Sequence, residues 1–112
     1  MKRIEAIIPS NRLNLIVAAI EEMGVSGITT IESKGRGKAA RPSLRSSRGT
    51  STQIAEYNSL VTIITIVEDS RVDQIIGAIL NVASTGSSGD GKIFISSVND
   101  VIDIQTKKKD IV

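Results

Sequence analysis

Residues 4–24 read IEAIIPSNRLNLIVAAIEEMG, and residues 61–84 read VTIITIVEDSRVDQIIGAILNVAS. Each stretch begins with aliphatic residues in the pattern of a β-strand. After a polar turn, each continues with apolar residues at three- and four-residue steps, which is typical of an amphipathic helix. Both turns end in an arginine followed by an aliphatic residue, Arg12-Leu13 and Arg71-Val72. The chain therefore contains two similar strand–helix units.

One further strand is expected after each unit. The pattern predicts strands over 4–8, 27–33, 60–67 and 92–98, and helices over about 12–23 and 72–83. Polar side chains are expected to cap the helices, from Ser10 and Asn11 before the first and from Ser70 with Asp73 before the second. Two βαβ units with right-handed crossovers form an α+β, ferredoxin-like sandwich, with a four-stranded antiparallel sheet backed by two helices. We expect a single domain over residues 1–112.

The composition limits the chemistry that the chain can carry. It has 112 residues with no Cys, His or Trp, and Ile supplies 19 of its 45 apolar residues. Without thiols or imidazoles there is no cysteine nucleophile, no histidine base and no zinc or iron–sulfur site of the usual ligands. No apolar run approaches the roughly 20 residues that span a bilayer. We therefore expect a cytoplasmic protein that holds no metal and does not insert into membranes.

The charge is unevenly distributed along the chain. Residues 34–48 hold six basic residues and no acidic one, whereas the remainder carries eight basic and twelve acidic residues. The region from Gly35 to Ser59 has no helix or strand pattern, and a loop of about 25 residues is expected to be either functional or disordered. Six cations on such a loop could capture an acidic partner, or could simply keep a solvated loop soluble.

A second loop is rich in glycine. Residues 86–92 read GSSGDGK, which satisfies most of the phosphate-binding GxxxxGK pattern. Position 93 is Ile rather than Ser or Thr, and Lys92 starts a predicted strand rather than a helix, so the pattern excludes a P-loop NTPase. Three glycines still allow backbone N–H groups to converge on an anion, with Lys92 adding a positive charge. The alternative interpretation is a flexible surface turn.

The glycine loop also carries a resemblance to a known family. Residues 85–95, TGSSGDGKIFI, resemble the C-terminal signature of the PII nitrogen-regulatory signalling proteins, and residues 1–9 and 23–29 are similar to that family's opening. The resemblance implies a homotrimer of ferredoxin-like subunits with adenine nucleotides between neighbours. It also implies a T-loop at about 36–58 that docks on a target protein (a transporter, an enzyme or a regulator), a B-loop at about 84–91 and a C-loop at about 103–109.

The resemblance further implies which residues bind ligands. The adenine is expected beside the main chain near Gly27 and Thr29, and the phosphates at the T-loop base and the glycine loop. The implied nucleotide-binding set is Ile7, Gly27, Thr29, Gly35, Gly37, Lys38, Ile66, Gly89, Asp90, Gly91 and Lys92. The implied partner-binding residues are Arg36, Arg41, Arg45, Arg48 and Thr50. From its position between two glycines alone, Asp90 is expected to tie down its own loop.

Several positions depart from the family pattern. Asp103 and Gln105 stand where the family has two phosphate-binding arginines, and a carboxylate repels a nucleotide. Ala39 replaces a glutamine of the magnesium–2-oxoglutarate site, Leu60 replaces the lysine that pairs with 2-oxoglutarate, and the tyrosine that some members uridylylate falls near Thr52. We therefore expect ADP or AMP to bind in preference to ATP, without a 2-oxoglutarate response, and with Arg36, Arg41 or residues 107–109 as compensating cations.

Other function classes fit the sequence less well. RNA-recognition modules of this fold stack bases on sheet aromatics, and only Phe94 lies on a predicted strand. An enzyme would have only carboxylates as acid–base groups, and Glu5, Asp69 and Asp90 are not spaced as a recognisable pair. We expect a regulatory binding protein that is neither an enzyme nor a nucleic-acid binder. Within the family, a PII-like protein linked to inorganic-carbon uptake or carboxysomes is an alternative to nitrogen signalling.

Overall fold

The computed structural model describes residues 1–37, 40–45 and 52–110. The main sheet contains β1 (Lys2–Pro9), β2 (Thr29–Gly35), β5 (Asn58–Val67) and β6 (Lys92–Ser97). Helices α1 (Leu13–Glu22) and α2 (Val72–Ala83) each follow a short 3-10 turn, Ser10–Arg12 and Asp69–Arg71. Two further strand pairs lie outside this sheet, β3 (Ser43–Arg45) with β4 (Thr52–Ile54), and β7 (Val101–Ile102) with β8 (Lys109–Asp110).

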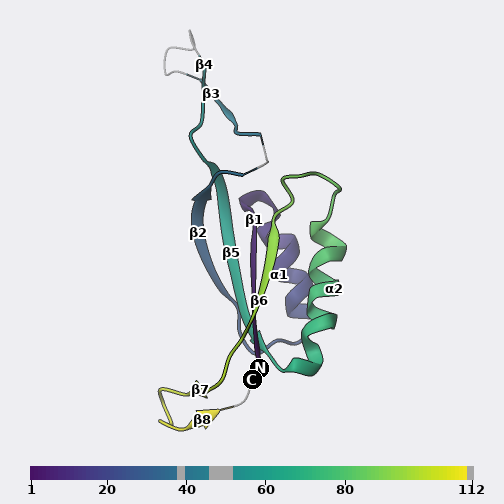
Figure 1. Ribbon diagram of the computed structural model, residues 1–112, viewed down its shortest axis with the longest axis vertical. Helices are drawn as coiled ribbons and strands as arrows, with labels where there is room; N and C mark the ends of the chain where they lie inside the picture. The colour runs from purple at the N-terminus through teal and green to yellow at the C-terminus, as the bar shows by residue number, and fades with distance from the viewer. Residues whose placement is uncertain (38–39, 46–51, 111–112) are drawn as a thin grey trace.

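The main sheet has the topology of two interleaved βαβ units. Its strand order is β2–β5–β1–β6, and every neighbouring pair is antiparallel. Both helices cover the same face of the sheet (Figure 1). The register places Ala6 opposite Ile63 on one side and Ile93 on the other, so that small and β-branched side chains meet beneath the helices. The predicted ferredoxin-like fold is therefore confirmed.

Aliphatic side chains fill the space between the sheet and the helices. On α2 the buried positions are spaced by four, at Ile75, Ile79 and Ala83, so one stripe of the helix faces the sheet. Leu80, one residue beyond Ile79, is half exposed, because one further residue turns a side chain about 100° around the helix. The buried core consists of Ile4, Ala6, Ile8, Ile16, Ile20, Val61, Ile63, Val67, Ile75, Ile79 and Ala83.

Arginines bind carbonyls at the C-terminal ends of the two helices, whereas the serine and asparagine caps expected at the N-terminal ends are not formed. Neither helix has a side-chain cap at its N-terminus, so the predicted caps are wrong. Arg12, just before α1, donates through Nη2 to the carbonyl of Val82 at the end of α2. Arg71, just before α2, donates through Nη2 to the carbonyl of Met23 at the end of α1. The equivalent arginines of the two units therefore each cap the other unit's helix.

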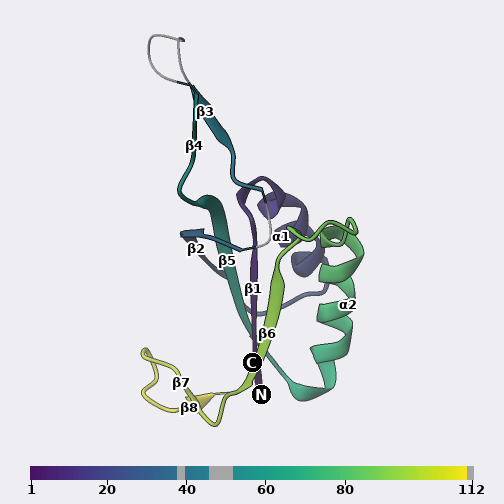
Figure 2. The same cartoon turned by 45° about the horizontal axis from the view of Figure 1, so that its top comes forward.

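Two hairpins project from opposite ends of the sheet, as the two views in Figures 1 and 2 show. The β3–β4 ribbon belongs to segment 36–58 and projects from one end of the sheet. The expectation that this segment lacks secondary structure is wrong for its described part, because strands of three residues are too short to leave a periodic pattern. The β7–β8 hairpin, also not predicted, projects from the other end.

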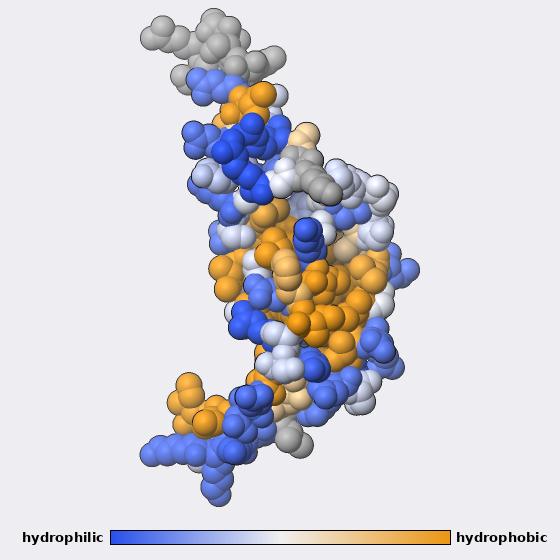
Figure 3. Space-filling model, in the orientation of Figure 1, coloured by the Kyte–Doolittle hydropathy of each residue, from blue (hydrophilic) through white to orange (hydrophobic). Residues whose placement is uncertain are grey.

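The sheet face opposite the helices carries apolar residues that the helices do not cover. Ile31 and Phe94 lie on this face and are each about half exposed. Figure 3 shows hydrophobic residues gathered over the body of the molecule, and smaller hydrophobic patches among hydrophilic residues on the described parts of the two projections. The register across this face runs Thr29–Ile64–Glu5–Phe94 in one row and Ile31–Thr62–Ile7–Lys92 in the next.

Candidate functional site

The glycine loop between α2 and β6 is held together by one carboxylate. Asp90 accepts hydrogen bonds from the Thr85 N–H (2.7 Å), the Thr85 hydroxyl (2.5 Å) and the Gly86 N–H (3.1 Å). The Asp90 N–H in turn donates to the Ser87 carbonyl (3.2 Å). The prediction that Asp90 ties down its own loop is confirmed.

The same donors determine the charge of Asp90. Hydrogen bonds from the Thr85 hydroxyl and N–H, with smaller contributions from Gly86 and Ser87, hold the pKa of Asp90 below its ordinary value of 3.8. The carboxylate is therefore ionised at neutral pH. The backbone donors at the start of the loop already face an anion that belongs to the chain itself.

Gly91 brings the end of the loop against β1. Its φ is +112°, and a Cβ at this position would lie 2.1 Å from the carbonyl oxygen of Ile7, so only glycine fits. The next residue, Lys92, pairs with Ile7 in the sheet. Three residues of the implied nucleotide-binding set, Ile7, Gly91 and Lys92, therefore lie together at one end of the sheet.

A cavity of about 640 Å³ separates the glycine loop from the stem of segment 36–58. The cavity is lined by the glycine loop, the starts of α1 and β5, and Ala40 of the stem. Gly89 and Asp90 line it opposite Ala40 of the stem, whereas Gly35 and Gly37 of the implied set do not line it. Leu60 contributes an apolar surface, and Arg12 and Asp90 are the charged residues among those that line it. Sequence reasoning missed Arg12, whose only signal was its equivalence to Arg71.

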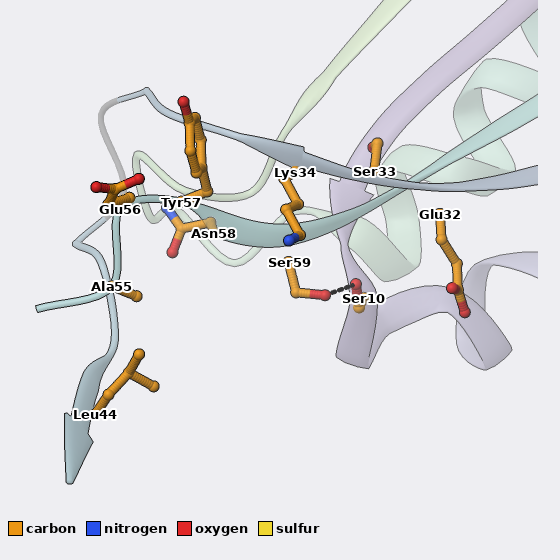
Figure 4. Close-up of a pocket in the computed structure, with 10 residues that line it drawn as sticks. All are labelled: Ser10, Glu32, Ser33, Lys34, Leu44, Ala55, Glu56, Tyr57, Asn58 and Ser59. Atoms are coloured by element: carbon orange, nitrogen blue, oxygen red, sulfur yellow. Dashed lines mark hydrogen bonds between the residues drawn. The ribbon is translucent and has the colours of Figure 1, made fainter. Parts of the chain in front are cut away.

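A second hollow, of about 710 Å³, lies at the foot of the β3–β4 ribbon. Lys34 lies opposite Ser59 across β2 and β5, and the Ser59 hydroxyl is 2.8 Å from that of Ser10 (Figure 4). Glu32 and Glu56 also line this hollow. Two carboxylates around a single lysine do not favour an anionic ligand, so the first cavity is the better candidate for phosphates.

Two of the implied partner-binding arginines fasten the stem of the ribbon. The Arg36 guanidinium lies 5.5 Å from the centroid of the Tyr57 ring, a cation–π contact. Arg41 donates through Nη1 to the Glu56 carbonyl (3.4 Å). Arg45 belongs to β3. The remaining implied residues of this segment, Lys38, Arg48 and Thr50, lie outside the described residues.

The residues implied to hold the adenine lie on and just before β2, the edge strand opposite the β6 edge that carries Lys92. The Thr65 hydroxyl donates to the Gly27 carbonyl (2.7 Å), and Thr29 begins β2. Gly35 ends the same strand six residues later, so at roughly 3.3 Å per residue the two ends are ~20 Å apart. Ile66 is likewise near the far end of β5. A single chain does not gather the implied set around one ligand.

Asp103 and Gln105 lie in the turn between β7 and β8. The Asp103 carboxylate accepts a hydrogen bond from the Thr106 N–H (3.0 Å), and its carbonyl accepts one from the Lys107 N–H (2.8 Å). Lys107 adopts a φ of +62°, which reverses the chain. Asp103 therefore shapes the hairpin turn.

Comparison with known proteins identifies the family of this chain. The family model for nitrogen regulatory protein P-II matches residues 1–108. The chain belongs to the P-II family. The P-II protein of Azospirillum brasilense is 39% identical over 109 residues, covering 97% of this chain and 96% of the relative. That of Rhizobium meliloti (strain 1021) is 39% identical over 106 residues (95% and 93%), and that of Synechocystis sp. is 36% identical over 110 residues (98% and 96%).

Membership of the P-II family indicates the general class of protein to which this chain belongs. P-II proteins are regulatory signalling proteins that bind adenine nucleotides and 2-oxoglutarate and act on target proteins as trimers. Among the residues that the structure describes, no helix is long and apolar enough to cross a membrane. The described side chains also contain no group of three or more His, Cys, Asp or Glu residues arranged to hold a metal ion.

Proposed function

We propose that this chain is a trimeric, cytoplasmic P-II regulator that binds ADP or AMP between its subunits and controls a target protein through segment 36–58. The observation that carries the proposal is the division of the implied site between the two edge strands of the sheet. Lys92 begins β6 beside the glycine loop and Thr29 begins β2, with β1 and β5 lying between these two strands. A ligand that touches both sets must sit between two subunits.

The preference for ADP or AMP over ATP rests on the missing arginines. Two charge-assisted hydrogen bonds, each contributing roughly 1.5–3 kcal/mol, are lost with Asp103 and Gln105 in those positions. A ligand with fewer phosphate charges needs these contacts less. Arg36 and Arg41 are engaged with the loop stem, and Lys109 pairs with Asp100 (3.3 Å), so compensation by these cations is incomplete.

The absence of a magnesium-dependent 2-oxoglutarate response rests on Ala39, Leu60 and the state of Asp90. Leu60 brings an apolar side chain to the cavity instead of a countercharge for a carboxylate. The carboxylate in the cavity, that of Asp90, is already engaged by three hydrogen bonds. Magnesium demands nearly ideal octahedral oxygen ligation, and these residues do not fit it.

Calorimetric titration of the purified protein tests the proposal. ATP, ADP and AMP are titrated separately, each with and without 2-oxoglutarate and magnesium. We expect ADP or AMP to bind more tightly than ATP, with affinities that do not change when 2-oxoglutarate and magnesium are added. Tight ATP binding that strengthens with both additions would contradict the ligand preference, and indifference to all three nucleotides would contradict nucleotide sensing itself.

The positive charge of segment 36–58 provides a test of whether the target binds through it. Because residues 34–48 carry six basic residues and no acidic one, we expect the target to present an acidic surface, with affinity that falls as salt is added. Once a target is known, Arg41→Glu should weaken its capture, because it reverses one of the six positive charges of residues 34–48. Target binding unaffected by salt would contradict this mode of docking.

A further inference from the structure

Asp90 sits inside the glycine loop, and we propose that it is a positioning residue for the nucleotide phosphates rather than a contact to them. Its carboxylate fixes the start of the loop, so that the loop tip and Lys92 meet the ligand. The identity of the ligand as a nucleotide rests on the proposed function, whereas the action of Asp90 on its loop does not.

The hydrogen bonds of the loop show which donors are already used. The Thr85 N–H, the Thr85 hydroxyl and the Gly86 N–H all point at Asp90. The Thr85 hydroxyl also accepts from the Ser87 N–H (3.4 Å), and the Ser87 hydroxyl accepts from the Gly89 N–H (3.3 Å). Within the described part of the chain, the Ser88 N–H makes no hydrogen bond. The Ser88 N–H at the loop tip is therefore one donor left for an external anion.

Charge explains why this carboxylate can sit beside a phosphate. A bare carboxylate would repel the ligand, but three donors at 2.5–3.1 Å offset the charge of Asp90. Two cations lie close to the same loop, Arg12 across the cavity and Lys92 two residues along the chain. An ionised acceptor holds donors more strongly than a neutral one, so the charge of Asp90 serves to order the loop.

The first test follows the loop without any ligand, by nuclear magnetic resonance of the Thr85 and Gly86 amide protons. Asp90→Asn should shift both signals and lower their protection from solvent exchange, because one carboxylate oxygen becomes an amide donor. Thr85→Val removes the hydroxyl and should give a similar loss, whereas Thr85→Ser keeps the hydroxyl and should leave protection near that of the parent chain. Unchanged amides in Asp90→Asn, or equal behaviour of the Val and Ser variants, would overturn the proposal.

The second test measures ADP binding by calorimetry. We expect Asp90→Asn to weaken ADP binding about tenfold. Thr85→Val should bind ADP more weakly than Thr85→Ser does. Asp73→Asn, an equal change of charge on the exposed face of α2, is the control and should leave affinity unchanged. Tighter binding by Asp90→Asn would mean that the carboxylate opposes the phosphate, and unchanged binding would mean that it does not position the site; either overturns the proposal. If the parent chain binds no adenine nucleotide, the proposed function fails while the amide measurements still decide the role of Asp90.

Discussion

At the scale of single residues, two glycines show how local geometry decides the effect of one methyl group. In Gly91→Ala the new Cβ would meet the Ile7 carbonyl oxygen at 2.1 Å, in a backbone with φ of +112°. Left-handed backbone alone costs an L-residue about 1–2 kcal/mol, so we expect a loss of at least about 2 kcal/mol in the free energy of unfolding. Gly77→Ala lies within α2 with no atom within 4 Å, and should gain about 0.5–1 kcal/mol. Urea denaturation of both variants measures the contrast, and a Gly91→Ala chain as stable as the parent would contradict the close approach.

The titration of Asp90 is a second prediction at this scale. Because hydrogen bonds from Thr85 lower the folded-state pKa of Asp90, the loop's hydrogen bonds are fully present above the ordinary value of 3.8 and are lost as the pH falls through the lower, folded value. The amide shifts of Thr85 and Gly86 should therefore stay constant from neutral pH to about 4 and change only below 3.8. Asp90→Asn should abolish the change. A midpoint at or above 3.8 in the parent chain would show that these donors do not act on the carboxylate.

At the scale of elements, the paired arginines link the two βαβ units. Arg71 donates to the carbonyls of Met23 and Gly24 (3.4 Å to the latter), where the last carbonyls of α1 otherwise lack partners. Arg71→Met keeps the aliphatic part of the side chain but removes the donors, so we expect a loss of about 1–3 kcal/mol in the free energy of unfolding. Arg41→Met, which removes a single exposed donor from the loop stem, is the control and should change stability by less than about 0.5 kcal/mol. Equal losses in a urea titration would contradict a specific capping role for Arg71.

The elements also show what the sequence pattern could and could not predict. The four strands of the main sheet and both helices were predicted within two residues at each end, because each is at least six residues long and so leaves a recognisable pattern in the sequence. The strands β3, β4, β7 and β8 have two or three residues each and leave no periodic signal. At the site, the role of Asp90 could be predicted because the bonds span only five residues. The cavity beside Arg12 could not, since it depends on how the start of α1, the end of α2 and the start of β5 pack together.

At the scale of the whole molecule, the chain is less compact than its length requires. Its radius of gyration is 17.2 Å, against about 13 Å for a compact domain of this size, because the two hairpins project from opposite ends. Surfaces that find no cover within one chain are expected to find it in an oligomer, particularly in a short chain with a modest core. Both the open sheet face and the divided ligand site need a neighbouring subunit. We therefore expect that disrupting this face removes nucleotide binding as well as assembly.

Phe94→Glu tests that expectation. Phe94 is about half exposed on the open face and lies opposite Glu5, so a second carboxylate would place like charges side by side where we expect subunits to meet. Sedimentation velocity should show the trimer of the parent chain replaced by monomer, and calorimetry should show the loss of ADP binding, since Gly27 and Thr29 of one subunit no longer approach the glycine loop of another. Leu80→Glu is the matched control, because Leu80 is equally exposed but lies on the helical layer, and it should remain a trimer that binds ADP. A Phe94→Glu trimer would place the interface elsewhere, and a monomer that still binds ADP would show that one chain suffices for the site.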